Sequence, residues 1–92
     1  MSKFSFVTDV KSEAFCLSIA SNMMKRFGMS EDEAIGRINR QLRNIKEWVG
    51  DKHLYYHRDT EEWANDIYYE EDYENNSIWW VEGSNPRPKP YP

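Results

Sequence analysis

Apolar residues recur every three to four positions over the first half of the chain, which predicts amphipathic helices there. The first apolar stripe comprises Phe15, Cys16, Ile19, Ala20, Met23, Met24 and Phe27. Ser12 is placed to act as its N-cap, and Gly28 follows where a left-handed residue commonly ends a helix. The pattern therefore predicts a helix over residues 12–27.

A second stripe follows almost at once. It comprises Ala34, Ile35, Ile38, Leu42, Ile45 and Val49. Ser30 and Glu33 have the spacing of a capping box, and Gly50 is a natural stop, so we expect a helix over residues 31–49. The short connection implies an antiparallel or steeply angled helix pair. Gly36 lies inside this helix at a cost of about 1 kcal/mol, which indicates that another backbone or ring approaches it closely.

Beyond Gly50 the helical period is interrupted. The stretch "GDKHLYYHRD" has no clear helical period and predicts a turn followed by a short extended segment. Asp59 with Glu62 forms a second capping box, which predicts a third helix over residues 60–70. The buried side of that helix would carry Trp63, Ala64, Ile67 and Tyr68.

The two ends of the chain have weaker patterns. Phe4 and Phe6 alternate with polar residues, as expected for a short strand or an extended arm with both rings on the core. The stretch "SIWWVEG" has the β-branched and aromatic content of a short strand. Four prolines in the last seven residues predict a polyproline-like tail, either packed over an aromatic surface or mobile.

Together these elements predict a mainly α fold, with α+β as the alternative. Residues 1–83 would form a single small globular domain, and residues 84–92 would form the proline-rich tail. We expect the rings of Tyr55, Tyr56, Trp79 and Trp80 to contribute to a core between the third helix and the hairpin.

Composition limits the classes of protein to which the chain can belong. Its 92 residues are enough for one domain with a small core. The single cysteine, Cys16, excludes an internal disulfide framework and is typical of a reducing compartment. The chain has neither the apolar run of a signal peptide nor an apolar stretch of membrane length. We therefore expect a cytoplasmic protein.

The net charge of −4 is unevenly distributed. Residues 1–58 contain ten Lys and Arg against seven Asp and Glu, whereas residues 59–92 contain two against nine. An acidic half disfavours nucleic acid as its direct partner, because phosphates would be repelled. It favours a basic partner, although an acidic surface that only maintains solubility is the simpler alternative.

Several motifs occur together in one order. They are "RFGMSEDEAIGRIN" (26–39), "YYHRDTEEWANDIYY" (55–69), "WW" (79–80) and the closing "PYP" (90–92). As a set they resemble a group of small bacterial proteins of unknown function, although Arg58 and Glu70 stand where that group tends to have an acid and a glycine. The resemblance implies a helical hairpin followed by a tryptophan-rich end, and it implies no activity.

Candidate catalytic groups are few. In an extended segment, His53 and His57 would stand about 13 Å apart, too far to share a metal ion about 2 Å from each nitrogen. The glutamate that follows the first histidine in zinc proteases is replaced by Leu54. Cys16 lies on an apolar stripe, where thiols usually act as small hydrophobes. We expect no cofactor, no metal and no enzymatic activity, with a metal-dependent enzyme at the two histidines kept as the second alternative.

Arg37, Arg40 and Arg43 form a basic row on the predicted second helix. Such a row can follow a phosphate backbone, so nucleic-acid binding is the first alternative function. The structural interpretation is that these arginines pair with Glu33 and Glu47 of the same helix or with the acidic third helix, while their stems cover apolar surface.

The aromatic and acidic run that ends the third helix is the remaining feature. Tyrosines beside carboxylates suit a protein interface, where rings supply area and acids supply steering. We therefore expect a non-enzymatic protein-interaction module, one form of which is an immunity or antitoxin-like inhibitor that meets a basic partner. The expected partner-binding residues are Asp66, Tyr69, Glu70, Glu71, Asp72 and Tyr73.

Overall fold

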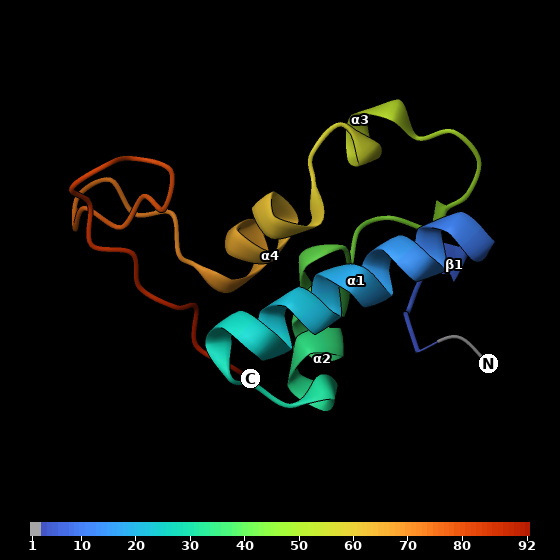
Figure 1. The fold of residues 1–92 in the computed structure, drawn as a ribbon, viewed down its shortest axis with the longest axis horizontal. Helices are drawn as coiled ribbons and strands as arrows, with labels where there is room; N and C mark the ends of the chain where they lie inside the picture. The colour runs from blue at the N-terminus through green and yellow to red at the C-terminus, as the bar shows by residue number, and fades with distance from the viewer. Residues whose placement is uncertain (1–2) are drawn as a thin grey trace.

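Helices dominate residues 3–92, the part of the chain that the computed structural model describes (Figure 1). The elements are β1 (Val7–Thr8), α1 (Val10–Phe27), α2 (Glu31–Gln41), β2 (Glu47–Trp48), α3 (His53–Tyr56) and α4 (Thr60–Tyr68). Helix α1 packs against both α2 and α4. The prediction of a mainly α fold with short extended segments is confirmed.

Helix α1 begins two residues earlier than predicted. Its N-cap is Asp9, whose carboxylate accepts the N–H of Ser12 at 2.9 Å, while the Ser12 hydroxyl accepts the N–H of Asp9 at 2.9 Å. Ser12 therefore completes a capping box as its third residue and is fully buried. The predicted end is confirmed, because Gly28 has a φ of 72° and its N–H returns to the carbonyl of Met24 at 3.0 Å.

Helix α2 starts as predicted but is shorter. Ser30 caps it through the N–H of Glu33 at 3.1 Å, and it ends at Gln41 rather than at residue 49. After Leu42 the chain turns and pairs β2 with β1 in parallel, and the N–H of Val7 donates to the backbone carbonyl of Lys46 at 3.0 Å. The prediction of a long second helix was wrong because this strand pairing provides backbone hydrogen bonds and buries Trp48.

Trp48 lies at the centre of an aromatic core and is completely buried. Its ring lies 6.5 Å from that of Phe6 and 5.6 Å from that of Phe15. Phe4 and Phe6 are both buried, which confirms that the N-terminal arm lays two rings on the core. The predicted apolar stripe of the second helix includes Ile45 and Val49 but not Trp48.

The stretch from His53 to His57 is a turn of helix, α3, and not an extended segment. The N–H of His57 donates to the carbonyl of His53 at 2.9 Å. Consecutive residues of a strand point to opposite faces, whereas Tyr55 and Tyr56 must both reach Trp48, at ring distances of 4.8 and 5.5 Å. A helical turn permits both contacts, which explains why the predicted conformation was wrong.

Helix α4 forms with the predicted capping box, in which Asp59 accepts the N–H of Glu62 at 2.8 Å. It ends at Tyr68, two residues before the predicted boundary. Trp63, Ala64 and Ile67 are buried as predicted. Tyr68 is half-buried and stacks on Phe27 of α1, with ring centroids 3.8 Å apart.

The predicted strand at residues 77–83 does not form. Ser77 makes an isolated bridge with Asp72, and the chain then closes two turns, with N–H to carbonyl distances of 3.0 Å (Val81 to Ile78) and 3.2 Å (Ser84 to Val81). Within residues 3–92 the sheet consists of β1 and β2, and neither pairs with this segment. Trp79 is only half-buried and Trp80 is 48% exposed, so the expected core role of these two rings was wrong.

The proline-rich tail packs against the helices, which agrees with the packed tail that was one of the two predicted alternatives. The N–H of Lys89 donates to the carbonyl of Tyr68 at 2.8 Å, and Arg40 donates to the carbonyl of Pro90 at 2.9 Å. The Tyr91 ring lies where a side chain at Gly36 would stand, which confirms that a ring approaches this glycine closely. The tail thereby returns the chain from the far loop to the helical hairpin (Figure 1).

Candidate functional site

The loop between α4 and the tail contains most of the acidic residues of the C-terminal part of the chain, residues 59–92. We call residues 70–82 the acidic loop, because they contain five Asp and Glu and no Lys or Arg. Arg87 of the tail secures its base, with its guanidinium 3.5 Å from Glu70 and 3.2 Å from Asp72. Ser77 is completely buried and donates its hydroxyl to the carbonyl of Glu70 at 3.0 Å. The base of the loop is therefore internally paired.

Part of the acidic loop faces solvent with both rings and charges, whereas Ile78 is buried and Trp79 is half-buried. Tyr73 is 67% exposed, and Trp80 and Val81 are about half exposed. No ion pair within residues 3–92 includes Glu71, Glu74 or Glu82, all of which are exposed. The exposed surface of the loop comprises its exposed charged and apolar side chains: Glu71, Tyr73, Glu74, Trp80, Val81 and Glu82.

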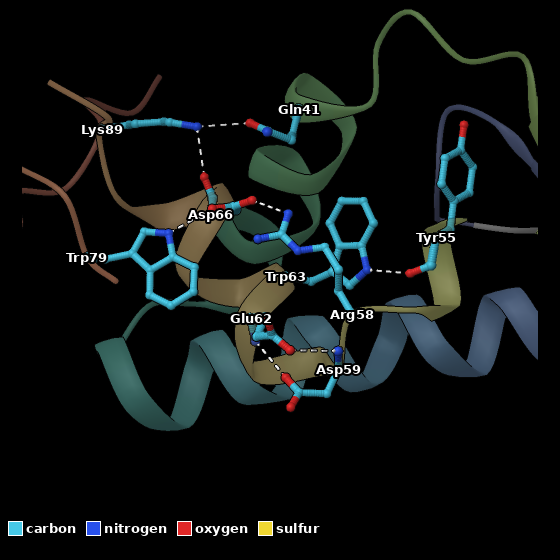
Figure 2. Close-up of polar contacts among 9 residues, drawn as sticks. All are labelled: Gln41, Tyr55, Arg58, Asp59, Glu62, Trp63, Asp66, Trp79 and Lys89. Atoms are coloured by element: carbon cyan, nitrogen blue, oxygen red, sulfur yellow. Dashed lines mark hydrogen bonds and ion pairs between the residues drawn. The ribbon is translucent and has the colours of Figure 1, made fainter. Parts of the chain in front are cut away.

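Asp66 of α4 is the junction between this loop and the helices. One carboxylate oxygen is paired with the guanidinium of Arg58, and the other accepts the indole N–H of Trp79 at 2.7 Å. Figure 2 shows Arg58 and Trp79 on either side of the Asp66 carboxylate. The charge of Asp66 is therefore compensated inside the protein, and its side chain fixes the position of Trp79.

Lys89 joins the tail to the same region. Its ammonium group donates to the carbonyl of Asp66 and to the side-chain oxygen of Gln41, both at 2.9 Å (Figure 2). Partial burial lowers the pKa of Lys89, and the negative charge of Asp66 partly opposes that effect. The ammonium group thus links α2, α4 and the tail.

A cavity of about 390 Å³ lies between these groups. Its lining comprises the acids Glu62, Asp66 and Glu71, the cations Arg58 and Lys89, the rings of Tyr69, Trp79 and Trp80, and the amide of Gln41. The volume is at the lower end of the range typical of ligand pockets, about 300–1,000 Å³. Such a cavity is large enough for a side chain or a small ligand.

The six residues predicted to bind a partner do not lie on one surface but have three kinds of surroundings. Asp66, Tyr69 and Glu71 line the cavity, Glu70 and Asp72 pair with Arg87, and Tyr73 is exposed. Of the six, Glu71 and Tyr73 are exposed, whereas the other four are half-buried: Asp66, Tyr69, Glu70 and Asp72. The Tyr73 hydroxyl donates to the Glu71 carboxylate at 3.2 Å, and that bond raises the pKa of Tyr73. Asp66 is thus a half-buried acid that is paired inside the protein.

Sequence reasoning missed the other residues around the cavity. Arg58, Gln41 and Lys89 come from three separate segments, and no local pattern brings them together. The adjacent pair Trp79 and Trp80 was the available signal, because neighbouring residues of an extended segment point to opposite faces, so one of the two indoles is expected at the surface.

The arginine row is largely occupied by intramolecular contacts. Arg37 is 5% exposed, binds Glu33 at 2.8 Å, and donates to the carbonyl of Lys89 at 2.9 Å. The predicted pairing within the helix is confirmed for this arginine. Arg40 binds the tail instead of the acidic helix, and Arg43 is exposed and donates to the carbonyl of Arg40 at 3.0 Å.

The two histidines lie on the same side of α3, with ring centroids 6.0 Å apart rather than the greater separation of an extended segment. Both are exposed. Across residues 3–92 no group of three or more His, Cys, Asp or Glu side chains is arranged to hold a metal ion. The same range contains no helix with the length and apolar character needed to cross a membrane.

Cys16 is completely buried in α1, as its position on the apolar stripe predicted. Burial raises the pKa of its thiol to about 12. The thiolate, which is the nucleophilic form, is therefore disfavoured at neutral pH.

These observations define a small mainly α protein with an acidic loop and an adjacent cavity. Comparison of the chain with protein-family models, with curated proteins and with solved structures gives no match. The resemblance described above therefore remains a prediction.

Proposed function

We propose that this protein is a non-enzymatic interaction module that binds a basic partner protein through the acidic loop. The observation that carries the proposal is the presence of three exposed carboxylates without an ion pair in residues 3–92, beside exposed rings. The carboxylates are Glu71, Glu74 and Glu82, and the rings are Tyr73 and Trp80.

The internal contacts support a role for these side chains in binding rather than in folding. Elsewhere in the acidic half, Glu70 and Asp72 are paired with Arg87, and Asp66 is paired with Arg58. Exposed aromatic rings lose little conformational freedom on binding and supply contact area, while nearby charges increase the rate of association with an oppositely charged surface.

A partner with a basic groove has the matching chemistry. Carboxylates spaced along a loop can occupy positions that phosphates of a nucleic acid would otherwise fill. An immunity or antitoxin-like inhibitor of a nuclease is the form of the proposal that follows from this complementarity. The arginine row supports nucleic-acid binding less well, since Arg37 and Arg40 are held by the tail and by Glu33.

Quantitative affinity purification from the native cell tests the proposal. The wild-type protein is compared with a triple charge reversal, E71K/E74K/E82K, and with a matched control, D32K/E47K/D51K. All six residues are exposed, and the two triple variants have the same net charge. Circular dichroism confirms that both variants fold.

The expected result is a partner of high isoelectric point that wild type and the control retain and that the loop variant loses. The proposal is overturned if no captured protein depends on the loop carboxylates, or if both triple variants lose the partner equally.

A further inference from the structure

The walls of the cavity are suited to a particular kind of side chain. Trp79 and Trp80 have ring centroids 5.6 Å apart and planes inclined at 84°, so the two indoles form two walls nearly at right angles. Indole faces attract cations more strongly than other aromatic side chains do. Trp79 is held in place by its N–H bond to Asp66 at 2.7 Å, so this wall is formed before any ligand binds.

The charges around the cavity also favour a cation. Asp66 is neutralised by Arg58, and Lys89 is held by Gln41 and by a backbone carbonyl. The two other carboxylates of the lining, Glu62 and Glu71, take part in no ion pair within the described chain. With three carboxylates against two cations, the lining has a formal charge of −1. An anion would have to approach these two carboxylates, whereas a cation would neutralise one of them.

We propose that the cavity binds the guanidinium group of an arginine side chain on the partner, between the two indoles and the carboxylates of Glu62 and Glu71. This inference rests on the proposed function and names the anchor of the interface. A guanidinium is planar and weakly hydrated, stacks on aromatic faces and donates to two carboxylates at once, whereas an ammonium is compact and strongly hydrated. Arginine is also among the residues most often found at the energetic centre of interfaces.

The site is continuous with the acidic loop. Glu71 and Trp80 belong both to the exposed surface of the loop and to the lining of the cavity. An arginine that enters the cavity would therefore bring its own chain close to Tyr73, whose hydroxyl donates to Glu71 at 3.2 Å. The diffuse attraction of the loop would bring a basic surface close, and the cavity would select one side chain of it.

Two-dimensional ¹H–¹⁵N NMR of the intact protein with a single-arginine peptide, acetyl-Gly-Gly-Arg-Gly-Gly-amide, tests the inference. The four tryptophans give four indole N–H signals, and W79F and W80F assign those of Trp79 and Trp80. We expect the arginine peptide to shift these two signals at millimolar concentration and to leave those of Trp48 and Trp63 unchanged. The same peptide with citrulline, which has the shape of arginine without its charge, should shift neither.

Two pairs of variants make the test specific. W80A should weaken binding about tenfold through loss of the cation–π contact, whereas V81A, an exposed neighbour outside the cavity, should leave it unchanged. E71Q should weaken binding up to about fivefold, and E74Q, which removes the same charge outside the cavity, should change it by less than about twofold.

The inference is overturned if the arginine peptide leaves the indole signals unshifted or if citrulline shifts them equally. Equal weakening by E71Q and E74Q would also overturn it, because binding would then be diffuse attraction to the loop. In that case the proposed function would still stand on the affinity purification. The proposed function itself would instead be rejected if the purification captured no protein whose binding depends on the loop carboxylates.

Discussion

The Tyr91 ring lies against the backbone of α2 at Gly36, in the space that a Cβ atom would occupy. The same ring lies 5.2 Å from the guanidinium of Arg37 and 5.3 Å from that of Arg40. A glycine inside a helix costs about 1 kcal/mol relative to alanine, so this close approach explains its presence. The absence of a side chain at Gly36 is therefore what allows Tyr91 of the tail to pack on α2.

A double-mutant cycle between Gly36 and Tyr91 should reveal the coupling between the two residues. In the Y91A background, G36A should raise the free energy of unfolding by about 1 kcal/mol, because alanine is the better helix former and no ring opposes it. In the wild-type background the gain should be clearly smaller, since the new methyl group displaces Tyr91. Urea denaturation measures both values. Equal gains in the two backgrounds would show that the ring does not rest on Gly36.

Arg37 should be sensitive to a conservative replacement. It is 5% exposed and bonds both Glu33 and the carbonyl of Lys89. Because an ammonium group cannot reproduce this forked geometry, R37K should lower the free energy of unfolding by about 1–3 kcal/mol. The exposed Arg43 provides the control, and R43K should change that energy by less than about 0.5 kcal/mol in the same urea titration. Similar effects of the two replacements would contradict the buried role of Arg37.

Asp66 should contribute to stability through its two partners. D66N removes the charge that pairs with Arg58 but keeps an oxygen for Trp79, whereas W79F removes only the indole bond. Since Asp66 and Arg58 are partly exposed, we expect D66N to cost about 1–2 kcal/mol and W79F about 1 kcal/mol. Thermal or urea unfolding measures both. D51N makes the same chemical change at an exposed residue before α3, and a D66N variant as stable as D51N would show that the ion pair adds nothing.

Helices α1, α2 and α4 were predictable because their signals are local. The capping residues Ser30 and Asp59 and the left-handed Gly28 mark their ends within a few residues of sequence. The end of α2 was not predictable in this way, because it depends on the pairing of β2 with Val7 and Thr8, about forty residues earlier in the chain. A helical continuation and a buried strand have similar apolar content over so short a stretch.

The candidate site was predictable only in part for the same reason. The acidic loop is visible in the sequence as a run of charges and rings. The pairing of Asp66 with Arg58 and Trp79, and the arrival of Lys89 beside α4, are contacts between separate segments. These contacts make Asp66 half-buried, which helical periodicity alone cannot indicate.

Asp9 should make stability depend on pH in the acid range. Its two carboxylate oxygens accept the N–H of Ser12 at 2.9 Å and that of Gly50 at 2.7 Å, which connect the start of α1 to the turn after β2. These bonds, that of Ser12 first, lower the pKa of Asp9 below its ordinary value of 3.8. A lowered pKa in the folded state gives stability that is present above pH 3.8 and is lost as the pH falls through the lowered pKa.

The free energy of unfolding from urea titrations between pH 7 and pH 2 should therefore fall less steeply for D9N than for wild type, because asparagine has no such proton equilibrium. D51N serves as the control and should retain the wild-type slope. A D9N slope as steep as that of wild type would show that these hydrogen bonds do not contribute to acid unfolding.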